Sequence, residues 1–399
     1  RKEKSMKITE IETIPVRMPV GFYRDGEDKT GGKNRPKKFY TGDPLVRNPL
    51  RNTDGHKLLD YVIVKIHTDE GITGVGEAPT DGKEPLEAVK FIIDKMFVPH
   101  LIGLDPFNLE RTIDTIRGRK SRGANRGSVS AIDLALYDLV GKSLNCNVST
   151  LLGGLYRNKV LASIEVPRNT PEKMAEHSLE YYEQGIRGIK AKVGSDYEND
   201  AKCLRAIRDA LGDDISLRAD VNGAYTVQQA IRFCDLANKY DVGLELIEQP
   251  TPTWDLDGMA RVVKAVDIPV EADESAYSLY QVFKILKHEA ADLINPKCSK
   301  AGGILGVKKW ASVTESAGKE IVVGTEYGLG LRVAAKVILG CALKNAQPIV
   351  EFTEIMLHDL LIKKPLVLKD GWIDVPTGPG IGWELDDEKI EKYIPAVFP

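Results

Sequence analysis

The sequence predicts an α/β protein in which a parallel (β/α) barrel follows a smaller α+β domain. Two patterns lead to this prediction. From about residue 159, short apolar runs alternate with helical segments, which is the order of elements in a parallel barrel. In the same region three apolar runs end in Asp220, Glu248 and Asp273, which lie 28 and 25 residues apart. A barrel repeats about once per 25–30 residues and gathers its strand ends at one mouth, so these carboxylates should meet there.

Composition argues against several classes of protein. The 399 residues are 42% hydrophobic and 28% charged, which is typical of a soluble protein with a large core and a second, smaller domain. The net charge of −3 is no signature of nucleic-acid binding. No apolar run reaches the ~18 residues that span a bilayer, so no membrane partner is expected. Five scattered cysteines form no CxxC pair, which argues against zinc or redox chemistry and favours reduced thiols in the cytoplasm.

In the first third of the chain strands precede helices, as in an α+β unit. Residues 6–20 alternate as a strand, and residues 59–67 and 72–78 form a predicted hairpin. Gly74-Val75-Gly76 lies inside this hairpin, so it is not a dinucleotide-binding fingerprint, which would open a helix. Helical periodicity follows at residues 85–96, 108–116 and 128–144. We expect this α+β domain to span residues 6–130, with a long loop at residues 21–57.

Eight apolar runs are the predicted barrel strands. They cover residues 160–166, 186–193, 215–221, 244–248, 268–273, 292–297, 321–326 and 348–351. The barrel is expected over residues 131–355, with an active site at the carboxyl ends of its strands. Turn signals follow in residues 369–371 and 376–380, so residues 356–399 are predicted to return to the N-terminal domain.

The three strand-end carboxylates predict a divalent cation site. Mg²⁺ prefers a few carboxylate ligands, with waters and substrate oxygens completing an octahedron. The alternative is that each residue caps the helix that follows, since Asp is a favoured N-cap. One capping Asp would be unremarkable in this position, whereas acidic residues at three successive strand ends favour the metal.

Lysines end the runs on either side of the carboxylates. Period-two alternation puts Lys190 and Lys192 on one side of their strand, which is the interior of a barrel. Repulsion between them is expected to lower the pKa of one and make it a usable base. Lys297 ends the sixth run and is the predicted second base, because strand ends hold side chains more firmly than loops do. Lys300 is expected to face solvent or to hold a neighbouring carboxylate.

The order of short motifs resembles the enolase superfamily, in its muconate-lactonizing branch. The matching segments are KAKVG, RADVNG, IEQP, EADES and NPKCSKAGG, with further matches at residues 135–139, 151–154 and 375–380. This resemblance covers nearly the whole chain. It implies a capping domain on a modified TIM (β/α) barrel of seven or eight strand–helix units, and a homo-oligomer.

The resemblance also implies site residues and a reaction. It assigns Asp220, Glu248 and Asp273 to Mg²⁺, with Mn²⁺ as an alternative, and names Lys192 and Lys297 as the acid/base pair. Lys190 would tune Lys192. The implied chemistry is removal of the proton α to a carboxylate of a small substrate, through an enolate that Mg²⁺ stabilises. An isomerase, either a cycloisomerase or a racemase/epimerase, is the expected enzyme.

Departures from neighbouring families narrow the expectation. The mandelate racemase branch pairs a lysine with a histidine at the seventh strand, where this chain has Gly324-Thr325-Glu326-Tyr327. Dipeptide epimerases carry Asp-x-Asp at the eighth strand, where this chain has Glu351-Phe352-Thr353-Glu354. These differences favour a Lys/Lys pair and argue against dipeptides. Glu326 and Glu351 either touch the substrate or hold neighbouring groups, and Asn222 is a further candidate contact.

The loop at residues 21–57 is the expected lid over the barrel mouth. It holds nine Lys or Arg residues against five Asp or Glu, so it suits an anionic substrate; the alternative is a solvated charged loop. Phe39 and Tyr40 are candidate walls of the pocket. A hydroxy-acid dehydratase working through the same enolate is the alternative enzyme, and a barrel that binds without catalysis is the alternative class. The complete set of lysines and carboxylates argues against the latter.

Overall fold

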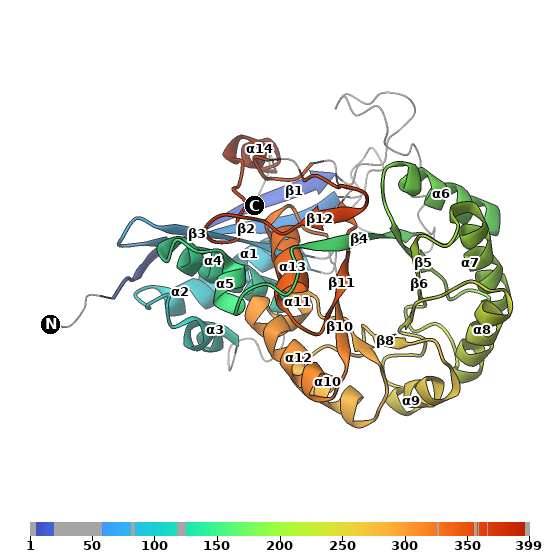
Figure 1. Ribbon diagram of the computed structural model, residues 1–399. Coiled ribbons are helices and arrows are strands. Elements are labelled where there is room, and N and C mark those ends of the chain that lie inside the picture. The colour runs from blue at the N-terminus through green and yellow to red at the C-terminus, as the bar shows by residue number, and fades with distance from the viewer. Residues whose placement is uncertain are drawn as a thin grey trace.

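The computed structural model describes residues 5–19, 58–80, 84–117, 125–324, 327–354, 357, 359–364 and 366–395. The predicted lid at residues 21–57 and the candidate substrate contacts Phe39, Tyr40 and Glu326 lie outside these ranges. Figure 1 shows a sheet domain packed beside a ring of strands and helices.

The N-terminal domain is built on an antiparallel sheet in the order β1-β2-β3. Its strands are β1 (Ile8–Pro19), β2 (Leu58–Thr68) and β3 (Thr73–Pro79). β2 and β3 form the predicted hairpin, with Tyr61 opposite Pro79 and His67 opposite Thr73. Helical segments follow: α1 (Leu86–Phe91), the π-helical turn η1 (Ile92–Phe97), α2 (Val98–Leu101), α3 (Leu109–Arg117) and α4 (Arg126–Ser143).

Helix α4 lies directly on β3, and two glycines allow this close approach. A Cβ on Gly74 would come within 2.1 Å of the Ala135 carbonyl oxygen, and a Cβ on Gly76 within 2.0 Å of the Ala131 carbonyl oxygen. The Gly-Val-Gly segment therefore serves helix–sheet packing. Nearly all of α4 is buried, because it is covered by the sheet on one side and by barrel helices on the other.

The barrel has eight parallel strands in chain order, and pairing of the last with the first closes it. The strands are β4 (Lys159–Val166), β5 (Gly188–Lys192), β6 (Ser216–Asp220), β7 (Ile247–Glu248), β8 (Val270–Ala272), β9 (Leu293–Ile294), β10 (Glu320–Val323) and β11 (Ala346–Glu351). This confirms the predicted fold class. A short strand, β12 (Trp372–Asp374), joins β4 in antiparallel fashion.

Helices connect the strands and surround them (Figure 1). They are α5 (Val148–Leu152), α6 (Pro171–Glu183), α7 (Tyr197–Leu211), α8 (Val227–Lys239), α9 (Leu256–Ala265), α10 (Leu279–Lys287), α11 (Cys298–Ala301), α12 (Ile304–Ser316) and α13 (Leu331–Ala342). Several begin at a side-chain cap, including the reciprocal Thr226–Gln229 capping box at α8.

Side chains fill the barrel interior in layers. Leu161, Leu246, Leu293, Val322 and Ile349 form an apolar cluster of their own, separate from the main core. Because side chains alternate along a strand, the next inward positions are two residues further on. Those positions are polar: Leu161 is followed by Ser163 and Glu165, and Leu293 by Asn295 and Lys297. The apolar layer therefore lies directly beneath the charged side chains of the barrel mouth.

The last part of the chain touches the N-terminal sheet. The backbone N–H of Arg17 donates to the Tyr393 carbonyl oxygen at 2.9 Å, and Lys65 pairs with Asp387 at the start of α14 (Asp387–Lys392). The division at residues 130 and 355 stays a prediction, and α4 runs through residue 130. Among the described residues, no helix combines the length and apolar character that crossing a membrane requires.

Candidate active site

The predicted carboxylates and lysines lie on consecutive strands of the barrel. Lys192 on β5 is in register with Asp220 on β6, and Asp220 is in register with Glu248 on β7. Asp273 directly follows β8, and Lys297 lies three residues beyond β9, where it is the N-cap residue of α11. The second lysine thus stands where a strand turns into a helix.

The strand order places the two lysines on opposite sides of the barrel mouth. β5 and β9 are four strands apart in a closed ring of eight, which is half of its circumference. β6, β7 and β8 fill one arc between them and carry Asp220, Glu248 and Asp273. A substrate held by those carboxylates, or by a cation on them, would therefore have a lysine on each face.

Lys190 is the centre of a buried ion-pair network. Its Nζ lies 2.5 Å from Glu351 Oε1, 2.9 Å from Glu248 Oε2 and 3.4 Å from both Asp220 and Glu165. Burial on its own lowers the pKa of Lys190, but Glu248, Glu351 and the other carboxylates outweigh it, and the pKa lies well above the ordinary range.

Lys192 points to the same carboxylates from nearer the mouth. Its Nζ lies 2.5 Å from Asp220 Oδ2 and 3.0 Å from Glu165 Oε1, and its side chain is 22% exposed. Burial and the charge of Lys190 lower its pKa, yet Asp220 and Glu165 raise it further, so the net shift is upward. The expectation that lysine–lysine repulsion lowers one pKa is therefore wrong for this arrangement, because the carboxylates between the lysines dominate.

A second cluster surrounds Asp273. Lys297 Nζ lies 2.6 Å from Asp273 Oδ2, and Lys300 contacts Asp273 Oδ1 and donates to its carbonyl oxygen at 2.8 Å. Burial alone raises the pKa of Asp273, but the two lysines together hold it well below the ordinary range. Lys300 is buried, so of the two predictions for it, the one that it holds a neighbouring carboxylate is correct and the one that it faces solvent is wrong.

Several residues of the site were missed in the sequence. They are Glu165, Glu271, Glu274 and Asn295. Glu271 and Asn295 each lie two residues before a predicted site residue, so strict period-two alternation along β8 and β9 would have found both. Burial and the nearby charge of Glu351 raise the pKa of Glu271 to about 8. Asn295 Nδ2 donates to Glu248 at 3.3 Å and to Glu351 at 3.2 Å.

Two candidate substrate contacts lie among these groups. The backbone N–H of Asn222 donates to Asp220 Oδ1 at 2.9 Å, and its side chain donates to Glu274 at 2.9 Å. Asn222 therefore links the carboxylate at the end of β6 to one that follows β8, and a contact with substrate stays a prediction. Glu351 is 3% exposed and holds Lys190, which matches the expectation that it binds a neighbouring group.

The carboxyl groups of the site are of the kind that binds a divalent cation, although in this structure they form ion pairs with the lysines. Within the described ranges, no group of three or more His, Cys, Asp or Glu side chains is arranged to enclose a metal ion. Carboxylates are nevertheless in excess over the cationic side chains among them, Lys190, Lys192, Lys297, Lys300 and Arg218. The seven carboxylates are Glu165, Asp220, Glu248, Glu271, Asp273, Glu274 and Glu351. Carboxylate oxygens are the ligands that Mg²⁺ prefers.

Comparison with known proteins identifies the family. A model described as "Enolase C-terminal domain-like" matches residues 173–389, and one described as "Mandelate racemase / muconate lactonizing enzyme, N-terminal domain" matches residues 48–153. The chain belongs to the mandelate racemase/muconate lactonizing enzyme family. The resemblance inferred from the motifs is thereby confirmed.

Relatives within this family are isomerases. The chain is 35% identical to an N-succinyl-L-Arg/Lys racemase from Bacillus cereus over 87% of this chain and 95% of that one. It is 31% identical to a chloromuconate cycloisomerase from Cupriavidus necator over 89% of this chain and 97% of that one. The structure of the L-Ala-D/L-Glu epimerase from Bacillus subtilis matches with a TM-score of 0.80, 29% identity and coverage of 94% and 98% of the two chains. The chain is accordingly an isomerase of this family.

Proposed function

We propose that this isomerase moves the proton α to a substrate carboxylate, with Lys192 and Lys297 as acid and base on opposite faces. The observation that carries the proposal is that Lys192 ends β5 and Lys297 follows β9, half a barrel apart, with Asp220, Glu248 and Asp273 on the arc between. A proton removed by one lysine can be replaced from the other side, which inverts a stereocentre.

The lysines must change protonation state for this to work. As they stand, both are cations held by carboxylates, Lys192 by Asp220 and Lys297 by Asp273. A divalent cation on the three carboxylates would supply charge stabilisation for the electrons left when the α proton departs. If a cation bound those carboxylates, their contacts with the lysines would weaken. A lysine with weaker carboxylate contacts has a lower pKa and gives up its proton more readily.

Mg²⁺ is the proposed cation, and Asp220, Glu248 and Asp273 are its proposed ligands. They are buried at neighbouring strand ends, and carboxylate oxygens suit this ion. Lys190 is proposed to hold Glu248 and Glu351 in place rather than to touch the proton, since its Nζ is deep in the barrel and surrounded by carboxylates.

The proposed substrate class is a small carboxylate with a hydrogen on its α carbon. Relatives are named for N-succinyl amino acids, a dipeptide and chloromuconate, so these compounds form the first panel. A lysine on each face suits racemisation or epimerisation. N-succinyl-L-lysine and its D enantiomer are therefore the first probes.

The test follows deuterium at the α carbon by NMR in D₂O with MgCl₂ present. We expect exchange from both enantiomers in the parent enzyme. Lys192→Ala should lower the exchange rate of one enantiomer, and Lys297→Ala that of the other, each by a factor on the order of 10²–10⁴. Both variants should lower the rate of racemisation by a similar factor.

Lys173→Ala is the control, because Lys173 lies on the exposed surface of α6, where its side chain pairs with Glu176. Its exchange should equal that of the parent. Unchanged exchange in both site variants, on a compound that the parent does exchange, would overturn the two-lysine proposal.

A further inference from the structure

The short helix α11 carries Lys297 at its start and Lys300 within it. It comprises only Cys298–Ala301, and Lys297 is its N-cap residue. Four residues cannot form a stable helix alone, so the position of α11 depends on what holds it from outside. Its last carbonyl groups have no partner inside the helix and need donors from elsewhere.

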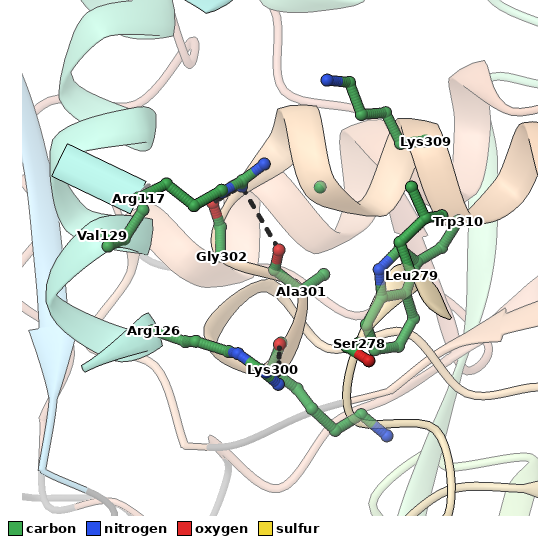
Figure 2. Close-up of a pocket in the computed structure, with 11 residues that line it drawn as sticks. Arg117, Arg126, Val129, Ser278, Leu279, Lys300, Ala301, Gly302, Lys309 and Trp310 are labelled. Atoms are coloured by element: carbon green, nitrogen blue, oxygen red, sulfur yellow. Dashed lines mark hydrogen bonds between the residues drawn. The ribbon is translucent and has the colours of Figure 1, made fainter. Parts of the chain in front are cut away.

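Two arginines of the N-terminal domain supply those donors. Arg117, at the end of α3, donates from Nη2 to the Gly302 carbonyl oxygen at 2.6 Å and to that of Ala301 at 3.3 Å. Arg126, at the start of α4, donates from Nη1 to the Lys300 carbonyl oxygen at 3.4 Å. Figure 2 shows both side chains reaching across to the end of α11. A cation at a helix C-terminus is favourable because the carbonyl ends carry partial negative charge.

The turn after α11 is tied to the same domain. Asp133 on α4 accepts from the backbone N–H of Ile304 at 2.5 Å and of Leu305 at 3.4 Å. A Cβ on Gly303 would lie 2.2 Å from the Asp133 carboxyl group, so glycine is required for this approach. Both ends of the α11–α12 connection are therefore fastened to α3 and α4.

The residues of α11 are buried and the helix packs on α4, but part of the side that faces the arginines borders open space. A cavity of about 170 Å³ lies there, and Arg117, Arg126, Lys300, Ala301 and Gly302 are among the residues that line it. Figure 2 shows this space between the arginines and Trp310. With open volume beside the helix, the arginine hydrogen bonds add to the packing on α4 and to the contacts of Lys297 and Lys300 with Asp273 in fixing its position.

We propose that Arg117 and Arg126 are positioning residues that hold Lys297 at its working place by fastening α11 to the N-terminal domain. This inference rests on the proposed role of Lys297 as one of the two bases. Neither arginine is assigned contact with substrate. Lys192, on β5 across the barrel, is held by strand pairing and does not depend on them.

The direct test is amide hydrogen exchange of the Mg²⁺-supplemented enzyme, followed by mass spectrometry. In Arg117→Ala and Arg126→Ala, amides of residues 298–304 should exchange faster by roughly tenfold or more, because each variant removes a charge-assisted hydrogen bond. Amides of residues 188–192 on β5 should exchange as in the parent. Unchanged exchange in residues 298–304 in both variants would overturn the proposal.

The functional test uses the two half-reactions. Deuterium exchange is measured with N-succinyl-L-lysine and with its D enantiomer at saturating MgCl₂. The enantiomer whose exchange requires Lys297 should lose on the order of 10–100-fold in Arg117→Ala, since a displacement of ~1 Å has effects of this size. The other enantiomer should change little, and Arg117→Lys should recover part of the loss. Equal losses for both enantiomers would indicate a general structural role and would overturn the positioning role.

Arg111→Ala is the matched control, since Arg111 lies on the exposed face of the same helix. It should match the parent in both measurements. A failure of the proposed function has a different signature: Lys192→Ala and Lys297→Ala would then not separate the enantiomers, and the arginine–helix contact would be judged by amide exchange alone.

Discussion

At the scale of single residues, Glu248 is a proposed metal ligand whose surroundings disfavour its charged form. It is fully buried, its neighbours include Asp220, Glu271 and Glu351, and burial together with the Asp220 charge raises its pKa well above the ordinary range. Lys190 and Asn295 contact Glu248, but its pKa stays raised in spite of these contacts. A cation bound among Asp220, Glu248 and Asp273 would stabilise the charged form of Glu248.

Mg²⁺ should therefore raise the thermal stability of the parent enzyme, and Glu248→Gln should remove that effect. Ligand binding to the folded state alone stabilises by about 2.7 kcal/mol at a hundred times the dissociation constant. Thermal melts with MgCl₂ and with EDTA measure it. Glu289→Gln, at an exposed carboxylate, is the control and should keep the full shift. A shift of parental size in Glu248→Gln would contradict the metal assignment.

At the scale of elements, α13 is tied to the segment that follows β11 by a buried ion pair. Lys336 Nζ lies 3.0 Å from both carboxylate oxygens of Glu354, and both side chains are almost fully buried. The helix is buried all round, so its packing leaves little room for an uncompensated charge.

Lys336→Met should destabilise the protein by about 3–5 kcal/mol, because it leaves the buried Glu354 carboxylate without this partner. Lys344→Met is the comparison. Lys344 pairs with Glu315 on the surface at the same 3.0 Å, and the expected loss is much smaller because solvent screens an exposed pair. Urea unfolding gives both values, and similar losses in the two variants would show that burial does not decide the strength of these pairs.

At the scale of the whole molecule, two buried carboxyl groups join the N-terminal domain to the barrel. Glu77 on β3 accepts from the backbone N–H groups of Leu329 and Arg332 at 2.9 and 3.0 Å, and Asp133 on α4 accepts from Ile304. Burial raises the pKa of each to about 7. Glu77 Oε2 and Asp133 Oδ2 have no hydrogen-bond partner among the described residues, as suits protonated groups.

These shifts predict a fall in stability as the pH rises. Above their ordinary pKa values near 4, both groups lose protons in the unfolded chain but keep them in the folded one until about pH 7. Each group therefore contributes its full stabilisation to the free energy of unfolding at low pH. This contribution declines between about pH 4.5 and 7, by about 1.4 kcal/mol per pH unit for each group.

The double variant Glu77→Gln, Asp133→Asn should flatten this decline, since its amides do not titrate. Unfolding free energies from urea titrations at pH 5 and pH 7, compared with those of the parent, check the prediction. An equal decline in parent and variant would mean that other groups set the pH dependence.

Much of the fold and site was predictable from local sequence. The eight apolar runs correspond to the eight barrel strands, because strand-forming residues and turn signals act over a few residues. Asp220, Glu248 and Lys192 end their strands and Asp273 directly follows one, whereas Lys190 lies two residues before the end of β5. Lys297 was assigned to a strand end, but the strand stops at Ile294 and α11 begins at Cys298, directly after Lys297.

Tertiary structure decided the charge state of the site and what holds it. The pKa values of Lys190 and Lys192 depend on how many carboxylates from other strands reach them, and spacing along one strand cannot reveal that number. Likewise, nothing near Lys297 in sequence indicates that Arg117 and Arg126, more than 170 positions away, donate to the helix that follows it. Sequence by itself determined the strands, their order and the residues at their ends, because those follow from local periodicity. The electrostatics and the support of α11 arise only when distant segments meet, since Coulomb interactions and hydrogen bonds depend on distance in space.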